Sequence, residues 1–575
     1  MPKIRTREPL LYALAGTLFI AFAWLAYLDN LPGISLKTRA VVCASLLAGY
    51  GGFFLMCAAL AFTLARRGGS LGALFAGQTR SVVGALGEMR AWLTGRSDGP
   101  GEIFTLLAII LLGLFLRTFF LAQPMRLDES YTFLYYLNEG RDPFLYNVPN
   151  NHVFHTLLAK LTVLAGGVSP VVIRLPAFLA GVLCIPASFF AAKAFHRNAG
   201  LLAALGMAVF PYMVLYSSMA RGYSLIVLLT LCLLLVGRFH LEKPSAAGCI
   251  LISLVSALGL FTIPTMAFPL AGFYLWMALA LLLKERNLPA LLRDFLLPTL
   301  TLTTLLTVFF YTPTLVSSNG AGAIFSNQYV DARSWDDFSR HIQPHVRQII
   351  SDFFRDVPTL AKYAAFFLVL AGLFDVARRR EWDTLLLAPS IILGGLVIFF
   401  AKQAIPFVRS WIYLIPFFLL FADIGYTYLT QTFAPRFKIV FHAALLITGL
   451  AFAGSLVSEN AITKYTDTGS FLEAQTVARY LKPLLTGDEF IGVMDTANFP
   501  LYYYLCAEHA PPQKKNINPA TVKRYYVVQE SWYKLSDLTS QPAEKIFVFG
   551  DATVYTAVLE NEPIWPGFVF ECRGG

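Results

Sequence analysis

Two adjacent carboxylates, Asp128 and Glu129, follow a long apolar run in a chain of which only 14% of the residues are charged. Acidic side chains beside a membrane segment are costly to desolvate, so they usually face a wet cavity and take part in chemistry there. Adjacent residues of a helix or turn point in different directions, so each acid is expected to have its own task. The structural alternative is helix capping, because both residue types are favoured in the first turn of a helix.

Four cations, Arg126, Arg221, Lys402 and Arg409, fall at loop edges that the hydropathy pattern places on the same side of the membrane as the acids. Guanidinium groups at a membrane surface suit bidentate binding of phosphate. The alternative for each cation alone is that it reaches out to lipid headgroups. Their convergence with the acidic pair favours a site for a phosphate-bearing substrate.

Two histidine pairs have spacings that place both rings on one face of a helix. His152 and His155 are three residues apart, and His341 and His345 are four apart with Pro344 between them. Either pair, completed by a carboxylate such as Glu129, suits a divalent metal ion, the one cofactor that these residues suggest. Hydrogen-bonding or structural roles are the commoner outcome for such pairs. His152 shares a predicted loop with the acidic pair.

The elements that must position these residues are membrane helices. The chain has 575 residues, 57% of them hydrophobic, and a mean hydropathy of +0.61, which indicates an α-helical polytopic membrane protein. Apolar runs of about 20 residues recur along it, as a membrane helix requires. We count 13 candidate spans, near residues 10–28, 40–64, 103–121, 172–193, 199–216, 224–238, 246–262, 265–283, 295–312, 361–376, 384–401, 410–430 and 439–457.

Basic residues cluster between alternate spans, as in Arg66–Arg67, Arg378–Arg380 and Arg436–Lys438. The positive-inside rule then predicts a cytoplasmic N-terminus and places the loop of Asp128 and the C-terminal tail on the external side of the membrane. This distribution explains the net charge of +10 and argues against nucleic-acid binding.

The chain divides into three parts by composition. Residues 1–101 are predicted to form a two-span hairpin and a basic cytoplasmic segment, and residues 102–457 the membrane body. Within the body, external segments at 122–171 and 313–360 carry amphipathic stretches that suit interfacial helices. Residues 458–575 alternate β-like and helical runs, which predicts a small extracytoplasmic α/β domain.

In that tail we expect strands near 490–494, 525–528 and 546–549 and helices over 472–485, 497–506 and 552–560. Spacing alone does not decide whether Cys506 and Cys572 form a disulfide or remain two free thiols. No GxGxxG or Walker A sequence follows a strand, which argues against an ATP-driven transporter.

The order of these motifs resembles the C-type (GT-C) membrane glycosyltransferases, which use polyprenyl-phosphate-linked sugars. It is most similar to the branch of protein O-mannosyltransferases, the lipid A aminoarabinose transferase and lipopolysaccharide galacturonosyltransferases. The resemblance covers about residues 102–430 and rests on five motifs in order. These are Leu127-Asp128-Glu129-Ser130-Tyr131, Asn151-His152 with Arg174-Leu175-Pro176-Ala177, Ala220-Arg221-Gly222-Tyr223, and Arg409 to Pro416.

The resemblance implies roles for these residues. Asp128 is expected to act as general base or to orient the acceptor, and Glu129 to contact the acceptor or a metal. His152, Arg221 and Arg409 match positions near the donor phosphate, and we add Arg126 and Lys402 because of their sidedness. Tyr131, His155 and Tyr223 are assigned to the acceptor side and its loops.

Two departures from the family pattern keep the substrate open. Val153-Phe154 follows His152 where relatives often have Pro-Pro, and Tyr131 replaces an Arg of the aminoarabinose transferase. The identity of the sugar is therefore not carried over from that enzyme.

The sequence favours a glycosyltransferase that moves a sugar from a polyprenyl phosphate to a lipid, polysaccharide or protein acceptor on the external face. Inverting displacement, contacts with membrane lipids and no nucleic-acid partner are expected. The alternative is a transporter or flippase of lipid-linked sugars, which predicts internal repeats and mid-span charge. A non-catalytic scaffold is the third reading.

Overall fold

The computed structural model describes residues 71–96, 99–138, 150–316, 322–325, 332–433, 438–511 and 522–559, with a few isolated positions before and between them. The two predicted N-terminal spans lie almost entirely outside these residues, as does Cys572. Cys506 is disulfide-bonded.

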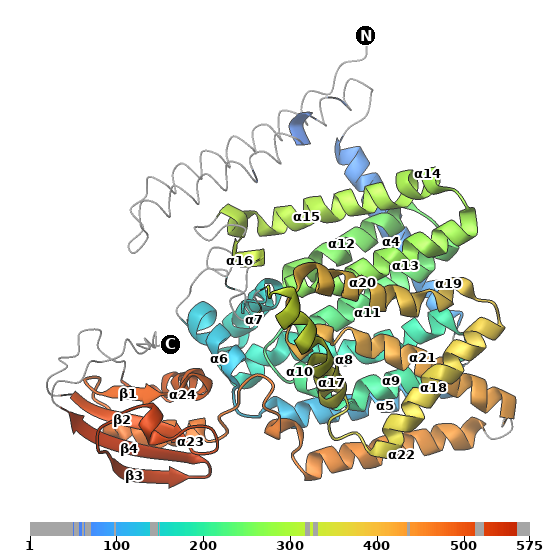
Figure 1. Cartoon of the computed structure of the whole chain (residues 1–575). Coiled ribbons are helices and arrows are strands. Elements are labelled where there is room, and N and C mark those ends of the chain that lie inside the picture. The colour runs from blue at the N-terminus through green and yellow to red at the C-terminus, as the bar shows by residue number, and fades with distance from the viewer. Residues whose placement is uncertain are drawn as a thin grey trace.

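The body of the protein is a bundle of apolar helices that run side by side (Figure 1). Eight helical segments of the described chain are long and apolar enough to cross a membrane. They are Pro100–Leu121 (α5), Pro170–Phe195 (α8), Tyr223–Glu242 (α11), Pro264–Glu285 (η3–α13), Leu288–Leu315 (α14–η4–α15), Thr359–Arg378 (α18), Trp382–Lys402 (α19–α20) and Val440–Ser458 in α22. Two further helices of the bundle, α12 (Ala246–Thr262) and α21 (Leu414–Phe433), fall at other predicted spans. The predicted total of 13 spans is not confirmed.

The remaining elements of the body are shorter or lie outside these spans. They are α4 (Leu71–Thr94), α6 (Leu127–Thr132), η2 (Phe133–Asn138), α7 (Val153–Gly166), α9 (Leu201–Val209), α10 (Pro211–Ser217), α16 (Gly322–Phe325), α17 (Trp335–Phe353), η5 (Val408–Trp411) and η7 (Ile462–Lys464).

One predicted span, 199–216, is broken into α9 and α10. Pro211 has no N–H, so a continuous helix would leave the carbonyl of Met207 without its usual donor. The buried guanidinium of Arg117, in α5, satisfies this carbonyl at 2.8 Å and that of Ala208 at 2.9 Å. The carbonyls freed at the break are thus satisfied by a cation from a neighbouring helix.

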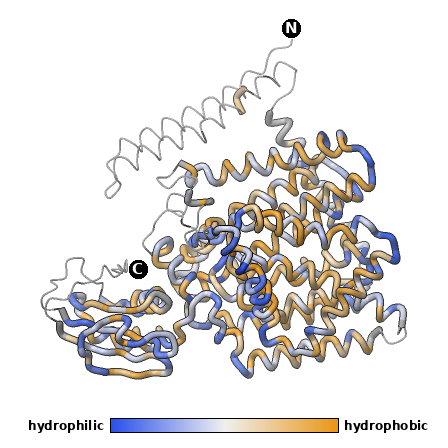
Figure 2. The backbone as a smooth tube through the Cα atoms, viewed as in Figure 1, coloured by the Kyte–Doolittle hydropathy of each residue, from blue (hydrophilic) through white to orange (hydrophobic). Residues whose placement is uncertain are grey.

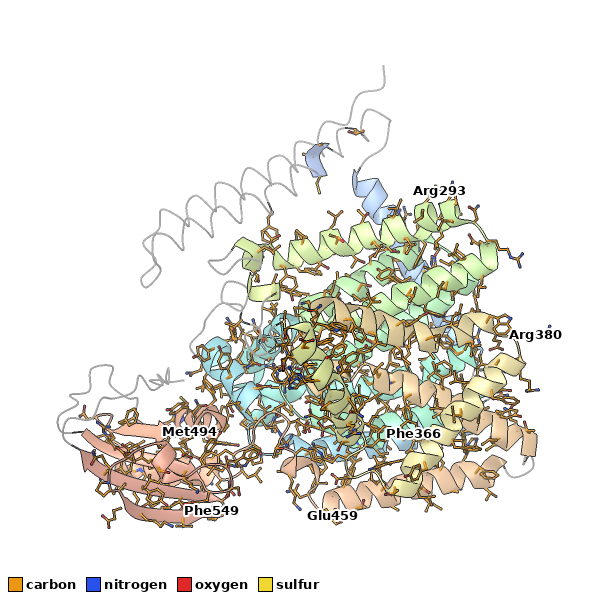
Figure 3. The ribbon with its side chains drawn as sticks, viewed as in Figure 1. Arg293, Phe366, Arg380, Glu459, Met494 and Phe549 are labelled. Atoms are coloured by element: carbon orange, nitrogen blue, oxygen red, sulfur yellow. The ribbon has the colours of Figure 1, made fainter. Side chains whose placement is uncertain are left out.

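The two ends of the bundle differ in character. At one end, ion pairs join loops that the charge pattern had assigned to one side, such as Arg96–Glu242 at 2.8 Å and Arg238 with Asp383. Figure 3 shows Arg293 and Arg380 at this end, away from Met494 and Phe549 in the C-terminal domain. We call these the basic end and the domain end.

Interfacial helices occupy the domain end, as the sequence predicted. The helices α6, η2 and α7 follow α5, and α17 lies within the second predicted external segment, 313–360. Figure 2 shows hydrophilic residues along α17 and orange, hydrophobic residues through the helices behind it. The buried Phe338 and Phe353 lie on the inner face of α17, so this helix packs by one side only.

The C-terminal α/β domain contains a four-stranded sheet of order β1-β2-β4-β3. Its elements are α23 (Ala474–Leu481), η8 (Lys482–Leu484), β1 (Phe490–Val493), α24 (Asp495–Ala507), β2 (Val522–Gln529), η10 (Leu535–Asp537), β3 (Glu544–Phe549) and β4 (Ala552–Leu559). Strand β1 is parallel to β2, and β4 is antiparallel to both β2 and β3.

The predicted helix over 552–560 is wrong, because these residues form β4. Gly550, at a φ of 57°, reverses the chain after β3. The following residues then pair with β2 on one side and β3 on the other. Pairing on both edges satisfies the backbone of a segment rich in Val and Thr, so tertiary context decides its structure.

The α/β domain packs directly on the interfacial helices. Phe133 and Leu134 share one apolar core with Leu501 and Tyr503 of α24. Met125 N–H donates to the hydroxyl of Tyr504 at 3.0 Å. The acidic motif thus lies between the membrane body and the C-terminal domain.

Candidate functional site

Asp128 lies in the first turn of α6 and is 8% exposed. Its Oδ2 is 3.2 Å from Nη2 of Arg409. Within the described part of the chain, this buried oxygen accepts no hydrogen bond. The carboxylate therefore faces a cation and keeps the capacity to accept a proton from another group.

Glu129, by contrast, is saturated by donors of the protein. Its Oε1 accepts from the N–H of Arg126 at 2.9 Å and from Nη2 of Arg174. Its Oε2 accepts from Nε of Arg174 at 3.0 Å and from the N–H of Ala220 at 2.8 Å. The contact with Arg126 N–H closes the first turn of α6, so the capping alternative holds for Glu129.

Arg174 is a residue whose role the sequence reasoning missed. Besides Glu129, its guanidinium bonds the carbonyls of Leu121 and Gln123, both at 2.7 Å, and that of Pro124 at 3.1 Å. These carbonyls lie at and just beyond the C-terminal end of α5, where a helix lacks internal donors. The available signal was an Arg near the start of an otherwise apolar span, at the membrane edge that holds the acids.

Arg221 and His152 meet beside Asp128. Arg221 lies in the turn between α10 and α11 and donates to the backbone carbonyl and the side-chain oxygen of Asn150, at 2.8 and 2.7 Å. Its Nη1 also donates to the hydroxyl of Thr132 at 3.1 Å. Its Nη2 is 2.9 Å from Nε2 of His152.

The state of His152 follows from its surroundings. Burial and the charge of Arg221 lower its pKa well below the ordinary value, so the ring is neutral. Its Nδ1 accepts from the N–H of Gly222 at 2.8 Å, which assigns the ring proton to Nε2. Two donors, His152 Nε2–H and Arg221 Nη2–H, then face each other, an arrangement that an anionic oxygen satisfies.

Arg409, in η5, is held by three groups. Its Nε donates to the hydroxyl of Tyr223 at 2.9 Å, and its Nη1 to the carbonyl of Asp467 at 3.0 Å. Its Nη2 faces Asp128. The ring of Tyr223 also stands edge-on to His152, with centroids 4.9 Å apart. Tyr223 therefore connects the two cationic halves of the site.

The segment 462–469 that leads into the α/β domain forms one wall of the site, and we call it the strap. Arg126 holds the strap by donating to the carbonyls of Ile462 at 2.8 Å, Thr463 at 3.2 Å and Tyr465. Both terminal nitrogens of Arg126 are thus used inside the protein. The predicted phosphate contact of Arg126 is not part of this geometry.

A second cation holds the strap from the side of α17. Nη1 of Arg355 pairs with Asp467 at 3.1 Å. Burial raises the pKa of Asp467 above its ordinary value, although Arg355 acts in the opposite direction. Leu127 N–H donates to the carbonyl of Gly469 at 3.2 Å. The strap therefore contacts α6 on one side and, on the other, the segment that follows α17.

Other predicted site residues stand apart from this cluster. Lys402 is exposed at the C-terminal end of α20, and His341 is exposed on α17 near Asp337. His345 accepts from the indole N–H of Trp411 at 3.0 Å. Among the described residues, no three His, Cys, Asp or Glu side chains converge as metal ligands.

His155 and Tyr131 lie in the elements that flank the cluster. His155 is fully buried, neither ring nitrogen has a hydrogen-bond partner in the described chain, and burial with the charge of Arg221 lowers its pKa to about 3. Tyr131 is half-buried one turn after Asp128.

The bundle, its interfacial helices and the packed α/β domain together have a GT-C-like fold. A particular similar structure is that of ArnT from Cupriavidus metallidurans in the apo state, with a TM-score of 0.52 and 14% identity. The similarity covers 80% of this chain and 98% of ArnT. At this identity it shows the fold alone.

Two other solved structures are similar at lower scores. ArnT bound to undecaprenyl phosphate gives a TM-score of 0.49 at 13% identity over 80% of this chain and 98% of that chain. The Archaeoglobus fulgidus oligosaccharyltransferase with Zn and sulfate gives 0.40 at 13% identity over 72% and 58%. No protein-family model and no curated protein sequence matches the chain.

Proposed function

We propose that the protein transfers a sugar from a polyprenyl-phosphate-linked donor to a hydroxyl of a lipid, glycan or protein acceptor. The reaction would take place at the domain end, on the external face of a bacterial inner membrane, with the N-terminus cytoplasmic. The observation that carries the proposal is the Oδ2 of Asp128. It is buried, accepts no hydrogen bond in the described chain and lies 3.2 Å from Arg409, in a wall of cations.

The donor phosphate would lie among Arg409, Arg221 and His152. Their N–H groups supply charge and hydrogen bonds to the oxygen that leaves sugar C1, which lowers the barrier to its departure. Placing an anion there also separates the facing donors of Arg221 and His152.

Asp128 would serve as the general base. The acceptor hydroxyl attacks C1 from the face opposite the phosphate, its proton passes to Asp128 Oδ2, and the C1–O bond to phosphate breaks with its electron pair. The polyprenyl phosphate departs and the configuration at C1 inverts.

The other predicted residues take indirect places in this proposal. Glu129 positions α6 against Arg174 and the turn before Arg221, and Arg126 fixes the strap. Tyr223 orients Arg409. The exposed Lys402 is placed at the membrane surface, where it would meet lipid headgroups.

Mass spectrometry of envelope glycans and lipids tests the proposal. A strain that lacks this chain is complemented with wild type, Asp128→Asn or Asp336→Asn, the last an exposed acid on α17 that serves as the matched control. We expect a sugar-sized mass to vanish in the deletion and return with wild type and control only. Full rescue by Asp128→Asn would refute the catalytic role and favour transport of a lipid-linked sugar.

A further inference from the structure

One face of α6 and η2 continues from Asp128 as a row of aromatic side chains. Tyr131 and Tyr135 stand three and seven residues after Asp128, which places all three side chains on one side of the helical segment. Both tyrosines are half-buried, whereas Glu129 and Phe133 on the other side are buried. The polar site and an aromatic surface thus share one continuous face.

The C-terminal domain completes this surface. The rings of Tyr131 and Tyr135 are stacked, with centroids 4.3 Å apart. Phe499 of α24 stands edge-on to Tyr131 at 5.0 Å and lies 6.2 Å from Tyr135. Phe499 is also half-buried. The three rings form an aromatic corner that needs both the membrane body and the α/β domain.

The charges around the corner discriminate against an anionic acceptor. The terminal nitrogens of Arg126 and Arg174 donate to protein oxygens, and Arg221 and Arg409 are assigned to the donor phosphate. Residues 458–575 carry 10 Lys and Arg against 14 Asp and Glu, so the domain that borders the corner is net acidic. A phosphate-rich acceptor would be repelled there, whereas an uncharged one would not.

We infer that Tyr131, Tyr135 and Phe499 form an acceptor subsite that stacks on the ring of an uncharged sugar, and this inference rests on the proposed transferase function. A pyranose presents an apolar C–H face to aromatic rings while its hydroxyls stay at the polar edge, so aromatic side chains with a few polar groups suit it. A sugar seated on the corner presents a hydroxyl toward Asp128. The acceptor class is therefore a neutral saccharide.

Saturation-transfer NMR on the full chain in lipid nanodiscs tests the inference. The probes are methyl β-glucoside, an uncharged sugar, and glucosamine 1-phosphate, an anionic one. We expect saturation of the glucoside ring protons by the wild type, reduced about 2- to 10-fold in Tyr131→Leu and in Phe499→Leu. Tyr131→Phe keeps the ring and should keep the signal. Trp532→Leu, an aromatic residue of the same domain that is 57% exposed, is the matched control.

Binding of undecaprenyl phosphate to the same proteins separates the possible failures. Wild type that binds the lipid phosphate but not the glucoside, a stronger signal from glucosamine 1-phosphate while undecaprenyl phosphate occupies the donor site, or unchanged signals in both Leu variants would each overturn the acceptor inference. Wild type that binds no lipid phosphate would overturn the proposed function instead. If a Leu variant also loses lipid phosphate, Tyr131→Phe decides, because loss of the glucoside signal there contradicts ring stacking.

Discussion

The adjacent acids Asp128 and Glu129 are expected to fail in different ways when each is made an amide. Every contact of Glu129 is with a donor, and each of its oxygens accepts from two of them. In Glu129→Gln the amide NH2 replaces one oxygen in either orientation and so faces two donors. Each buried donor left unsatisfied costs about 1–3 kcal/mol, so the loss is about 2–6 kcal/mol. A broken buried ion pair costs about 3–5 kcal/mol, which agrees.

Asp128→Asn is expected to lower the free energy of unfolding much less than Glu129→Gln does. Its carboxylate makes one 3.2 Å contact with Arg409, and an amide oxygen can still face that guanidinium. The expected cost is about 1 kcal/mol. The expected loss of transfer rate is about 10²- to 10⁴-fold, since an amide cannot take the proton of the acceptor.

Thermal unfolding in nanodiscs, followed by tryptophan fluorescence, measures the first effect, and sugar transfer measures the second. Glu129→Gln should unfold at a clearly lower temperature than Asp128→Asn. Adding Arg174→Met to Glu129→Gln should restore part of the loss, because it removes donors that the amide leaves unpaired. Glu129→Gln with wild-type stability and no transfer would refute our division of roles and give Glu129 a part in the chemistry.

Three further predictions concern charge and hydrogen bonding. Arg409→Lys should weaken binding of undecaprenyl phosphate about 10- to 100-fold, because lysine cannot keep the contacts of the guanidinium. The control Arg293→Lys, at the basic end, should bind this lipid normally. Equal affinities of the two variants would contradict the phosphate assignment. His155→Phe should reduce the fall in unfolding temperature that the wild type shows as the pH decreases. The pKa of His155 is lowered from 6.5 to about 3, so the stability that its neutral ring contributes is full above pH 6.5 and is lost as the pH falls toward 3. An unchanged slope of unfolding temperature between pH 7 and 5 in the variant would contradict this prediction. Arg117→Leu should destabilise the bundle by about 2–4 kcal/mol. Adding Pro211→Ala should recover part of this loss, because alanine supplies the backbone N–H that proline lacks. No recovery of stability would show that Arg117 does not stabilise the break between α9 and α10.

Periodicity and length predicted the elements that surround the site. The interfacial helices α6, η2, α7 and α17 lie within the predicted external segments 122–171 and 313–360, because one apolar face at helical spacing is a local property. The strands β1, β2 and β3 were predicted because short runs of β-branched and aromatic residues are also a local property. Strand β4 was predicted as a helix although its Val, Thr and Tyr residues favour a strand, and its pairing with β2 and β3 makes it a strand.

The sequence also predicted that three arginines lie at one membrane edge with the acids, but not what each one contacts. Arg126, Arg221 and Arg409 look alike as cations at loop edges. In the structure Arg126 binds the carbonyl of Ile462, 336 residues away, while Arg409 faces Asp128. A guanidinium binds whatever oxygen lies within its reach, and that oxygen is known only once the chain has folded.

The membrane class, the grouping of acids and cations at one edge and the presence of a separate α/β domain were determined by the sequence itself, because hydropathy and charge pattern are fixed by residue order. Which acid keeps an open oxygen was decided only by tertiary structure. Glu129 is closed by donors that α8 and the turn after α10 bring to it, and Asp128 is left facing Arg409. Two neighbours of the same charge differ because burial and hydrogen bonding depend on what packs against each.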